Sequence, residues 1–237
     1  MKNIAIIPAR SGSKGLRDKN VRLMCGRPLL AYTIEAAFES EQFDEVMVST
    51  DSDRYAEIAK AYGAQVPFLR DPKTSGDTAN SWDVVDEVLT QYRERYGKVF
   101  DTFCLLQPTS PLRDRQDIKA AYQLFYQKAS FAVVSVCEAE HSPLWCGYLP
   151  ESQELVNFVD RKGIMQRQAG EKFYRLNGAI YLVDVKRFSQ DRFLYQEGSF
   201  AYIMEQKKSI DIDTEIDFQY AELLMKSMLK TSESLEG

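Results

Sequence analysis

A loop rich in cations and small residues follows the first apolar stretch of the chain. Residues 4–7 are apolar, and Arg10, Lys14, Arg17 and Lys19 come soon after them, interleaved with serine and glycine. Glycine lets the backbone approach an anion closely because it has no Cβ, and consecutive backbone N–H groups form a concave anion site. This cationic loop (residues 9–20) predicts a polyphosphate site, with a solvated surface turn as the alternative.

Two well-known phosphate loops do not match the cationic loop. The dinucleotide fingerprint requires three glycines at fixed spacing, and this segment contains only Gly12 and Gly15. The nucleoside triphosphatase loop requires Gly-Lys followed by Ser or Thr, which occurs nowhere in the chain. A dinucleotide oxidoreductase and a nucleoside triphosphatase are therefore disfavoured.

A second polar loop (the proline loop, residues 107–113) follows a predicted strand at residues 102–106. It places Gln107, Thr109 and Ser110 around two prolines. Ligands of open α/β sheets gather beyond the carboxyl ends of the strands. These neutral side chains are therefore predicted to contact a heterocyclic or polyhydroxylated ligand; the alternative is a rigid turn that caps the next helix.

Two carboxylates lie close together near the C-terminal end, in an acidic segment (residues 209–213). The period of two in an extended chain puts Asp211 and Asp213 on one face. Two neighbouring carboxylates repel each other unless a cation lies between them, and Mg²⁺ binds a few carboxylate oxygens while keeping positions for water and phosphate. The pair predicts an Mg²⁺ site; the alternative is that Asp213 caps the following helix.

The three loops are connected by apolar stretches, typical of strands, that alternate with amphipathic stretches, typical of helices. Such alternation predicts an α/β fold with three αβα layers and a mostly parallel, twisted sheet. The strands are expected at residues 3–7, 45–50, 65–69, 102–106, 131–137 (as a central strand) and 176–183. The helices are expected at residues 28–39, 55–62, 117–128 and 217–228, together with a long helix that Asp77 or Asn80 can cap and that carries Val84, Val85, Val88 and Leu89.

The organisation predicted is a single domain with one insertion. Residues 1–229 form the domain, and residues 138–195 lack a helical face at their start, which predicts a β-rich arm. Residues 230–237 are a polar tail that is expected to fray.

Composition narrows the class of protein. The net charge of the 237 residues is −5, which disfavours a nucleic-acid partner because binding a polyanion needs a broad basic face. No apolar run is long enough for a membrane span, and no secretory leader is evident. The four cysteines form no Cys-x-x-Cys pair, which favours free thiols and a cytoplasmic location.

The three loops, in this order, resemble those of the cytidylyltransferases that activate nine-carbon sugar acids, the sialic acid family. The resemblance runs from Asn3 to about Leu224 and is carried by residues 8–15, 19–20, 48–51, 77–78, 106–113, 177–181 and 209–217. It implies a nucleotide-diphospho-sugar transferase-like variant of the Rossmann fold. The implied reaction joins CTP and a 2-keto sugar acid, such as N-acetylneuraminate or legionaminate, to give a CMP-sugar and pyrophosphate.

The resemblance also implies roles for residues on the nucleotide side. Those implied at the triphosphate or ribose are Arg10, Ser13, Lys14, Lys19 and Asn20. Those implied at the base are Arg70 and Ser81. Lys19, Arg10 and Asp211 are the implied catalytic residues, with Mg²⁺ held by Asp211 and Asp213.

On the sugar side, the resemblance implies contacts from several parts of the chain. Those with ribose and sugar are Gln107, Thr109, Ser110, Asn177, Tyr181 and Phe193, and the arginines for the sugar carboxylate are Arg167 and Arg175. Family members are homodimers in which the arm reaches the partner's site. Here Leu144-Trp145 stands where relatives often have a lysine, so His141 is a further candidate base.

Two other interpretations remain open on the sequence. One is a cytidylyltransferase for the eight-carbon sugar acid of lipopolysaccharide, which Lys14, Lys19 and Asn20 in the cationic loop disfavour. The other is a non-catalytic nucleotide-binding regulator of the same fold. The retention of both Asp211 and Asp213 disfavours a regulator, since a sensor does not need a metal centre.

Overall fold

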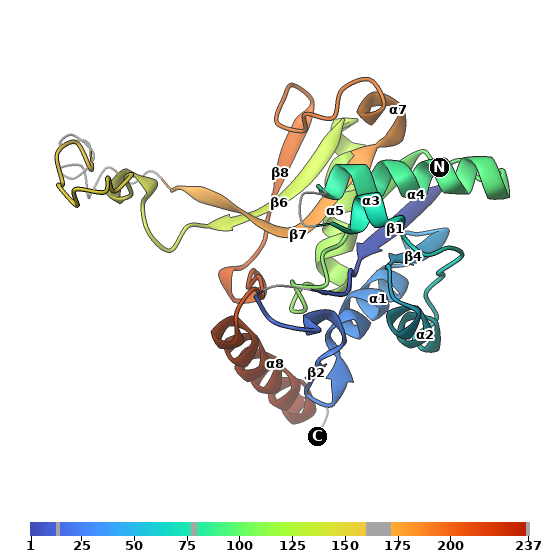
Figure 1. The fold of residues 1–237 in the computed structure, drawn as a ribbon, viewed down its shortest axis with the longest axis horizontal. Coiled ribbons are helices and arrows are strands. Elements are labelled where there is room, and N and C mark those ends of the chain that lie inside the picture. The colour runs from blue at the N-terminus through green and yellow to red at the C-terminus, as the bar shows by residue number, and fades with distance from the viewer. Residues whose placement is uncertain (13–14, 77–79, 160–171, 236–237) are drawn as a thin grey trace.

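A six-stranded sheet forms the middle layer of the molecule (Figure 1). The computed structural model describes residues 1–12, 15–76, 80–159 and 172–235. The strands, in spatial order, are β4 (Glu45–Ser49), β1 (Asn3–Pro8), β5 (Thr102–Leu105), β7 (Tyr174–Asp184), β6 (Ala132–Glu138) and β8 (Ser199–Ile203).

Most neighbouring strands run parallel. β1 pairs in parallel with β4 and β5, and β6 pairs in parallel with β8, whereas β7 is antiparallel to both β5 and β6. This arrangement confirms the predicted mostly parallel sheet. Two strand predictions were wrong in detail. β6 lies next to the edge strand and not at the centre, and residues 65–69 contribute only a bridge from Gln65 to Met47.

Helices cover both faces of the sheet, as predicted. One face packs on α1 (Leu29–Ser40), α2 (Asp53–Ala61) and α5 (Arg115–Lys128). The other packs on α4 (Ser81–Tyr96) and α7 (Val185–Phe188). Alternation along β1 explains the two cores, because Ala5 and Ile7 point into one and Ile4 and Ile6 into the other.

A third, smaller core lies beside the N-terminal segment. There α8 (Glu215–Leu235) packs Phe218 and Ala221 against Met24 and Ile212, close to the short hairpin β2 (Leu23–Met24) and β3 (Arg27–Pro28). The helix predicted at residues 217–228 is longer than expected, since α8 continues to Leu235. The small core keeps the acidic segment, which ends just before α8, close to the cationic loop.

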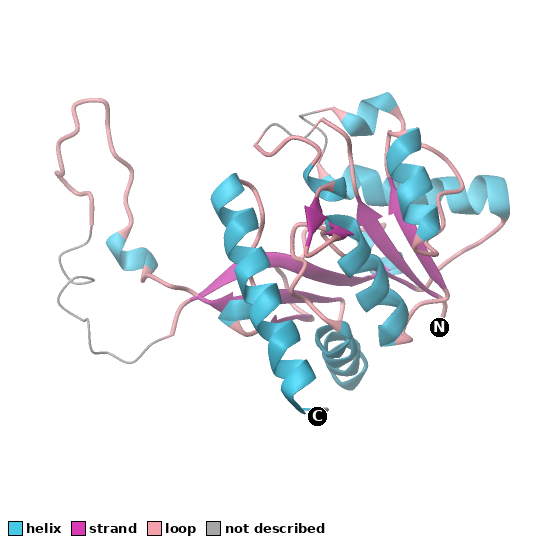
Figure 2. Cartoon of the chain, turned by 90° about the horizontal axis from the view of Figure 1, so that it is seen from below, coloured by secondary structure: helices cyan, strands magenta, loops and turns pink. Residues whose placement is uncertain are grey.

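The insertion projects from the body of the molecule (Figures 1 and 2). β6 and β7 stay paired up to Glu138 and Tyr174, so the arm comprises residues 139–173. Its described part contains a 3-10 turn, η2 (Pro143–Trp145), and no strand. The prediction of a β-rich insertion over 138–195 therefore needs correction: the long strand within that range, β7, belongs to the main sheet, where it pairs with β5 and β6.

Two predicted absences can be compared with the structure. Cys25, Cys104, Cys137 and Cys146 are all free thiols. Across the described ranges, no helix combines the length and the apolarity needed to cross a bilayer.

Candidate active site

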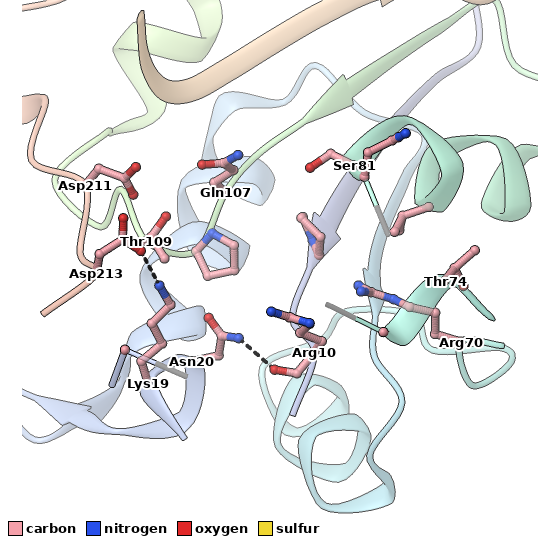
Figure 3. A pocket seen from close by; sticks show the side chains of 16 residues that line it. Arg10, Lys19, Asn20, Arg70, Thr74, Ser81, Gln107, Thr109, Asp211 and Asp213 are labelled. Atoms are coloured by element: carbon pink, nitrogen blue, oxygen red, sulfur yellow. Dashed lines mark hydrogen bonds and ion pairs between the residues drawn. The ribbon is translucent and has the colours of Figure 1, made fainter. Parts of the chain in front are cut away.

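A cavity of about 360 Å³ opens beyond the carboxyl ends of β1 and β5. Several predicted site residues from separate segments share its wall (Figure 3). They are Arg10, Lys19, Asn20, Arg70, Ser81, Gln107, Thr109, Asp211 and Asp213. The lining also includes residues to which the sequence assigned no site role: Pro8, Gly15, Thr74, Gly76, Asn80, Val84 and Pro108.

Asp51 and Tyr55, which follow β4, help to hold the described part of the cationic loop in place. Asp51 accepts hydrogen bonds from the backbone N–H of Ser11 (2.7 Å) and from its hydroxyl (3.0 Å). Tyr55 donates to Asp18 over 2.8 Å, and Asn20 donates to the carbonyl of Arg10 over 3.2 Å. These contacts therefore fix the shape of the described part of the loop.

Two arginines form one side of the cavity, opposite the acidic segment (Figure 3). Arg70 is 6% exposed, and its guanidinium donates to the hydroxyl (3.0 Å) and carbonyl (2.6 Å) of Ser49. Burial lowers the pKa of Arg70 to about 10, so it stays protonated at neutral pH. Arg10 donates to the carbonyl of Ser75 over 3.4 Å. This side of the cavity suits an anionic or carbonyl-rich ligand.

Lys19 and the acidic segment form the other side. The Lys19 ammonium lies 2.8 Å from a carboxylate oxygen of Asp213 and 2.8 Å from the carbonyl of Ile212. Gly15 approaches the same segment so closely that a Cβ would lie 2.5 Å from the carbonyl oxygen of Asp213. Only glycine fits at that position without moving the backbone.

Asp211 faces the cavity together with Asp213. Burial raises the pKa of Asp211, the charge of Asp213 adds to the effect, and a hydrogen bond from Thr109 and the charge of Lys19 oppose it. The described residues contain no cluster of three or more candidate metal ligands. Two carboxylates nevertheless match what Mg²⁺ needs, because it completes its shell with water and phosphate oxygens.

Hydrogen bonds join the proline loop to the acidic segment and to β7. Thr109 accepts a hydrogen bond from the backbone N–H of Ile212 over 2.9 Å. Arg113 is 1% exposed and donates to the carbonyls of Gln107 (3.4 Å) and Ala179 (3.3 Å). Gln107 and Thr109 line the cavity as predicted, but Ser110 does not, because it is fully buried beneath the loop.

Gly178 brings β7 up to the cavity. Its φ is +75°, and a Cβ would lie 2.7 Å from the amide oxygen of Gln107 and 3.6 Å from a carboxylate oxygen of Asp211. Any side chain at Gly178 would compete with both groups for space. The Asn-Gly pair inside an apolar strand was the available signal, since glycine within a strand often marks a close approach.

Asn177 and Tyr181, predicted at the sugar, are absent from the cavity wall. The Asn177 amide is buried between Ser135, which donates to it over 2.6 Å, and Ser209, to which it donates over 2.9 Å. Asn177 therefore joins β6, β7 and the acidic segment. Tyr181 packs edge-on against Trp82 at 5.5 Å, and burial raises its pKa to about 12.

The remaining sugar-side residues do not converge on the cavity. Arg175 forms two hydrogen bonds, of 3.0 and 2.9 Å, with the carboxylate of Glu140. Phe193 is 59% exposed and contacts Tyr195, and His141 is exposed at the start of the arm. Ser13, Lys14 and Arg167 lie outside the described residues.

Known proteins with similar sequences cover nearly the whole chain. An N-acylneuraminate cytidylyltransferase of Escherichia coli O18:K1:H7 is 37% identical over 93% of this chain, which spans 51% of that relative. A CMP-N,N'-diacetyllegionaminic acid synthase of Legionella pneumophila is 37% identical, with 95% of this chain and 97% of the relative covered. A pseudaminic acid cytidylyltransferase of Campylobacter jejuni is 34% identical with the same two coverages.

Solved structures agree on the fold. A CMP:2-keto-3-deoxy-manno-octonic acid synthetase complexed with CTP superposes with a TM-score of 0.70, at 18% identity, and covers 96% of this chain and all of its own. Residues 4–234 match the family described as cytidylyltransferase. With a match of that length and two relatives that align almost end to end, the chain belongs to the cytidylyltransferase family, as its three loops predicted.

Proposed function

We propose that this protein transfers CMP from CTP to a nine-carbon 2-keto sugar acid and releases pyrophosphate. The observation that carries the proposal is the cavity in which Arg10, Arg70 and Lys19 face the carboxylates of Asp211 and Asp213. Relatives named for N-acylneuraminate, N,N'-diacetyllegionaminic acid and pseudaminic acid support the substrate class. The eight-carbon alternative rests on a structure at 18% identity, which supports the fold alone.

The cations would bind the triphosphate. Arg10 and Lys19 are within the same cavity, and Lys19 can reach a phosphate once it leaves Asp213. Phosphoryl-type transfer depends on alignment and charge stabilisation rather than on covalent work by the protein. The anomeric hydroxyl oxygen would bond to the α-phosphorus, the bond to the β-phosphate would break, and the hydroxyl proton would pass to solvent.

The cytosine base would lie on the side of Arg70 and Ser81. Both residues line the cavity, and Asn80 holds the start of α4 by accepting a hydrogen bond from the N–H of Asp83 over 2.9 Å. A guanidinium fixed by Ser49 is well placed to donate to a base carbonyl. Fixed donors of this kind can select cytosine over other bases.

Asp211 and Asp213 would hold Mg²⁺. Their oxygens are the hard donors that this ion prefers, and both carboxylates face the cavity that would hold the triphosphate. When bound, Mg²⁺ would polarise the α-phosphate and lower the pKa of the attacking hydroxyl. Gly178 leaves space beside the Asp211 carboxylate because it has no side chain, and Thr109 donates a hydrogen bond to that carboxylate.

The sugar side would be completed in a homodimer. The described part of the arm exposes Tyr148, Leu155 and Val156 at 86%, 68% and 76%, away from the body of its own chain (Figure 2). An apolar groove of about 290 Å³ lies on β6 and β8 and is lined by Leu176, Phe200 and others. Burial of both surfaces between two copies would remove them from water, and Arg167 and Arg175 would then face the partner's sugar.

Pyrophosphate release provides the direct test. The protein is incubated with Mg²⁺, CTP and each of N-acetylneuraminate, legionaminate, pseudaminate and the eight-carbon acid, with ATP, GTP and UTP as nucleotide controls. We expect release with CTP and at least one nine-carbon acid, and a CMP-sugar by mass spectrometry. No release across the panel would contradict the proposal. A cytoplasmic location remains a prediction for fractionation of the source cells.

A further inference from the structure

A charged cluster lies behind the acidic segment, outside the cavity wall. The ammonium of Lys208 is 2.6 Å from a carboxylate oxygen of Asp114 and 3.2 Å from one of Asp117. Tyr202 donates to the other oxygen of Asp117 over 3.1 Å. The side chains of Lys208 and Asp117 are 14% and 6% exposed, so solvent screens this cluster much less than a surface ion pair.

The cluster connects two segments that supply the cavity. Lys208 ends the 3-10 turn η3 (Gln206–Lys208) and stands immediately before the acidic segment. Asp114 and Asp117 form the capping box at the start of α5, directly after the proline loop. One ammonium therefore joins the backbone that leads to Asp211 with the helix that follows Gln107 and Thr109.

Charge makes this connection stronger than the neutral hydrogen bonds near it. Burial alone would lower the pKa of Lys208, but the hydrogen bond to Asp114 and the charge of Asp117 raise it above its ordinary value. Lys208 therefore stays charged at all working pH values. Asp114 and Asp117 share a hydrogen-bonded cap, and without the ammonium their two charges would repel each other.

We propose that Lys208 is a positioning residue for Asp211: by holding Asp114 and Asp117 it fixes the acidic segment at its working distance from the proline loop. Two other hydrogen bonds also hold the acidic segment to its neighbours. The N–H of Ile212 donates to the carbonyl of Thr109 over 2.9 Å, and Arg175 donates to the carbonyl of Ser209 over 3.4 Å. Lys208 directly precedes the acidic segment, so a displacement of its backbone would also displace Asp211.

The proposal rests on the proposed function only for the rate measurements, because divalent-cation binding is read without turnover. The test variant is Lys208→Met, which removes the charge and keeps most of the side-chain length. The matched control is Lys207→Met in the same 3-10 turn, whose ammonium pairs over 2.8 Å with Glu205 at an exposed position. Lys208→Arg is the conservative variant.

Mn²⁺ is the probe of the acidic segment, and its binding is followed by electron paramagnetic resonance in the presence of CTP. Loss of a residue that orients a metal ligand typically weakens metal binding by about tenfold or more. We expect that loss for Lys208→Met, together with a comparable rise in the Mg²⁺ concentration for half-maximal rate. The KM for CTP should change less than about threefold, since Arg10 and Arg70 are untouched. Lys208→Arg should keep most of the Mn²⁺ affinity, and Lys207→Met all of it.

Each result supports or overturns the proposal. If Lys208→Met lowers the unfolding temperature but binds Mn²⁺ like the parent, the cluster serves stability alone and the proposal is wrong. If that variant does not fold, Asp117→Asn replaces it, because the amide keeps an acceptor for Tyr202 and removes one charge. Unchanged Mn²⁺ binding in folded Asp117→Asn would likewise overturn the proposal. A parent protein that binds Mn²⁺ and CTP but releases no pyrophosphate would contradict the proposed function and not the role of Lys208.

Discussion

The nucleotide side and the sugar side of the proposed site are built in different ways. On the nucleotide side, Arg10 and Lys19 come from the cationic loop and Arg70 from a separate segment, and all three line one cavity. On the sugar side, Arg175 is paired with Glu140, and Phe193 lies on the surface outside that cavity. The residues of the first half therefore meet within a single chain, whereas those of the second half do not, and we propose that the arm completes them.

This difference reflects what positions each half. The nucleotide residues follow strands of a rigid sheet, whose carboxyl ends meet at one edge. The sugar residues lie on or beside an insertion, and insertions vary more readily than the sheet that carries them. A nucleotide half common to the family and a sugar half that can change would suit relatives that are named for three different sugar acids.

The largest effect is expected from Asp211→Asn, because the proposed metal site lies between the nucleotide half and the sugar half. The substitution keeps the shape but removes a charge proposed to hold Mg²⁺, so kcat should fall about 100- to 1,000-fold. Thermal unfolding is the control and should show an unfolding temperature close to that of the parent. A rate within a few-fold of the parent would remove Asp211 from the metal site.

Replacement of the arm tests most directly whether the nucleotide half works independently of the sugar half. Glu138 and Tyr174 are paired neighbours on β6 and β7, so an Asn-Gly turn can replace residues 139–173 and close a hairpin. We expect the KM for the sugar acid to rise about tenfold or more, since a charged partner of its carboxylate is lost. Calorimetry should find CTP affinity within about threefold of the parent. A large loss of CTP binding would mean that the nucleotide half is not self-contained.

Arg10→Ala tests the nucleotide half from its own side. Loss of a charged donor to the triphosphate should raise the KM for CTP about tenfold, while the KM for the sugar acid stays near that of the parent. Arg17→Ala is the matched control in the cationic loop, because Arg17 does not line the cavity. Equal effects on both substrates would argue that Arg10 shapes the loop instead of binding CTP.

The smallest effect is expected from acid pH. Burial raises the pKa of Asp211 above its ordinary value, and the charged carboxylate is the form that binds a cation. Activity should therefore fall as the pH drops toward that raised pKa, by about threefold before ordinary aspartates protonate. Additional Mg²⁺ should move the acid limb to lower pH, because cation and proton compete for one carboxylate. An acid limb that ignores the Mg²⁺ concentration would assign it to another group.

The convergence of the nucleotide-side residues on one cavity could be predicted from the sequence because its signals are local. Arg10 and Lys19 belong to one loop after one strand, and parallel strands bring that loop to Gln107 and Asp211. The apolar run at residues 4–7 likewise predicted a strand at residues 3–7, within one residue of the end of β1. Local pattern and sheet geometry were sufficient there.

The sequence failed where distant partners decide the role of a residue. Asn177 was predicted at the sugar, but its amide is held by Ser135 and Ser209, which lie 42 and 32 residues away. The Lys208 cluster escaped notice for the same reason, since Asp114 is 94 residues away. The strand predicted at residues 65–69 is reduced to the bridge from Gln65 to Met47, because tertiary context overrides local β preference.

The ion pair between Lys19 and Asp213 bears on how CTP and its cation enter. Within the pair, the carboxylate already has a positive partner and the ammonium a negative one. A triphosphate alone would have to draw Lys19 away from a bare carboxylate, and a divalent cation alone would have to displace an ammonium; each event separates opposite charges. CTP and its cation arriving together supply both replacements at once. Loading is therefore expected to be an exchange of ions, with the metal–nucleotide complex entering as one unit.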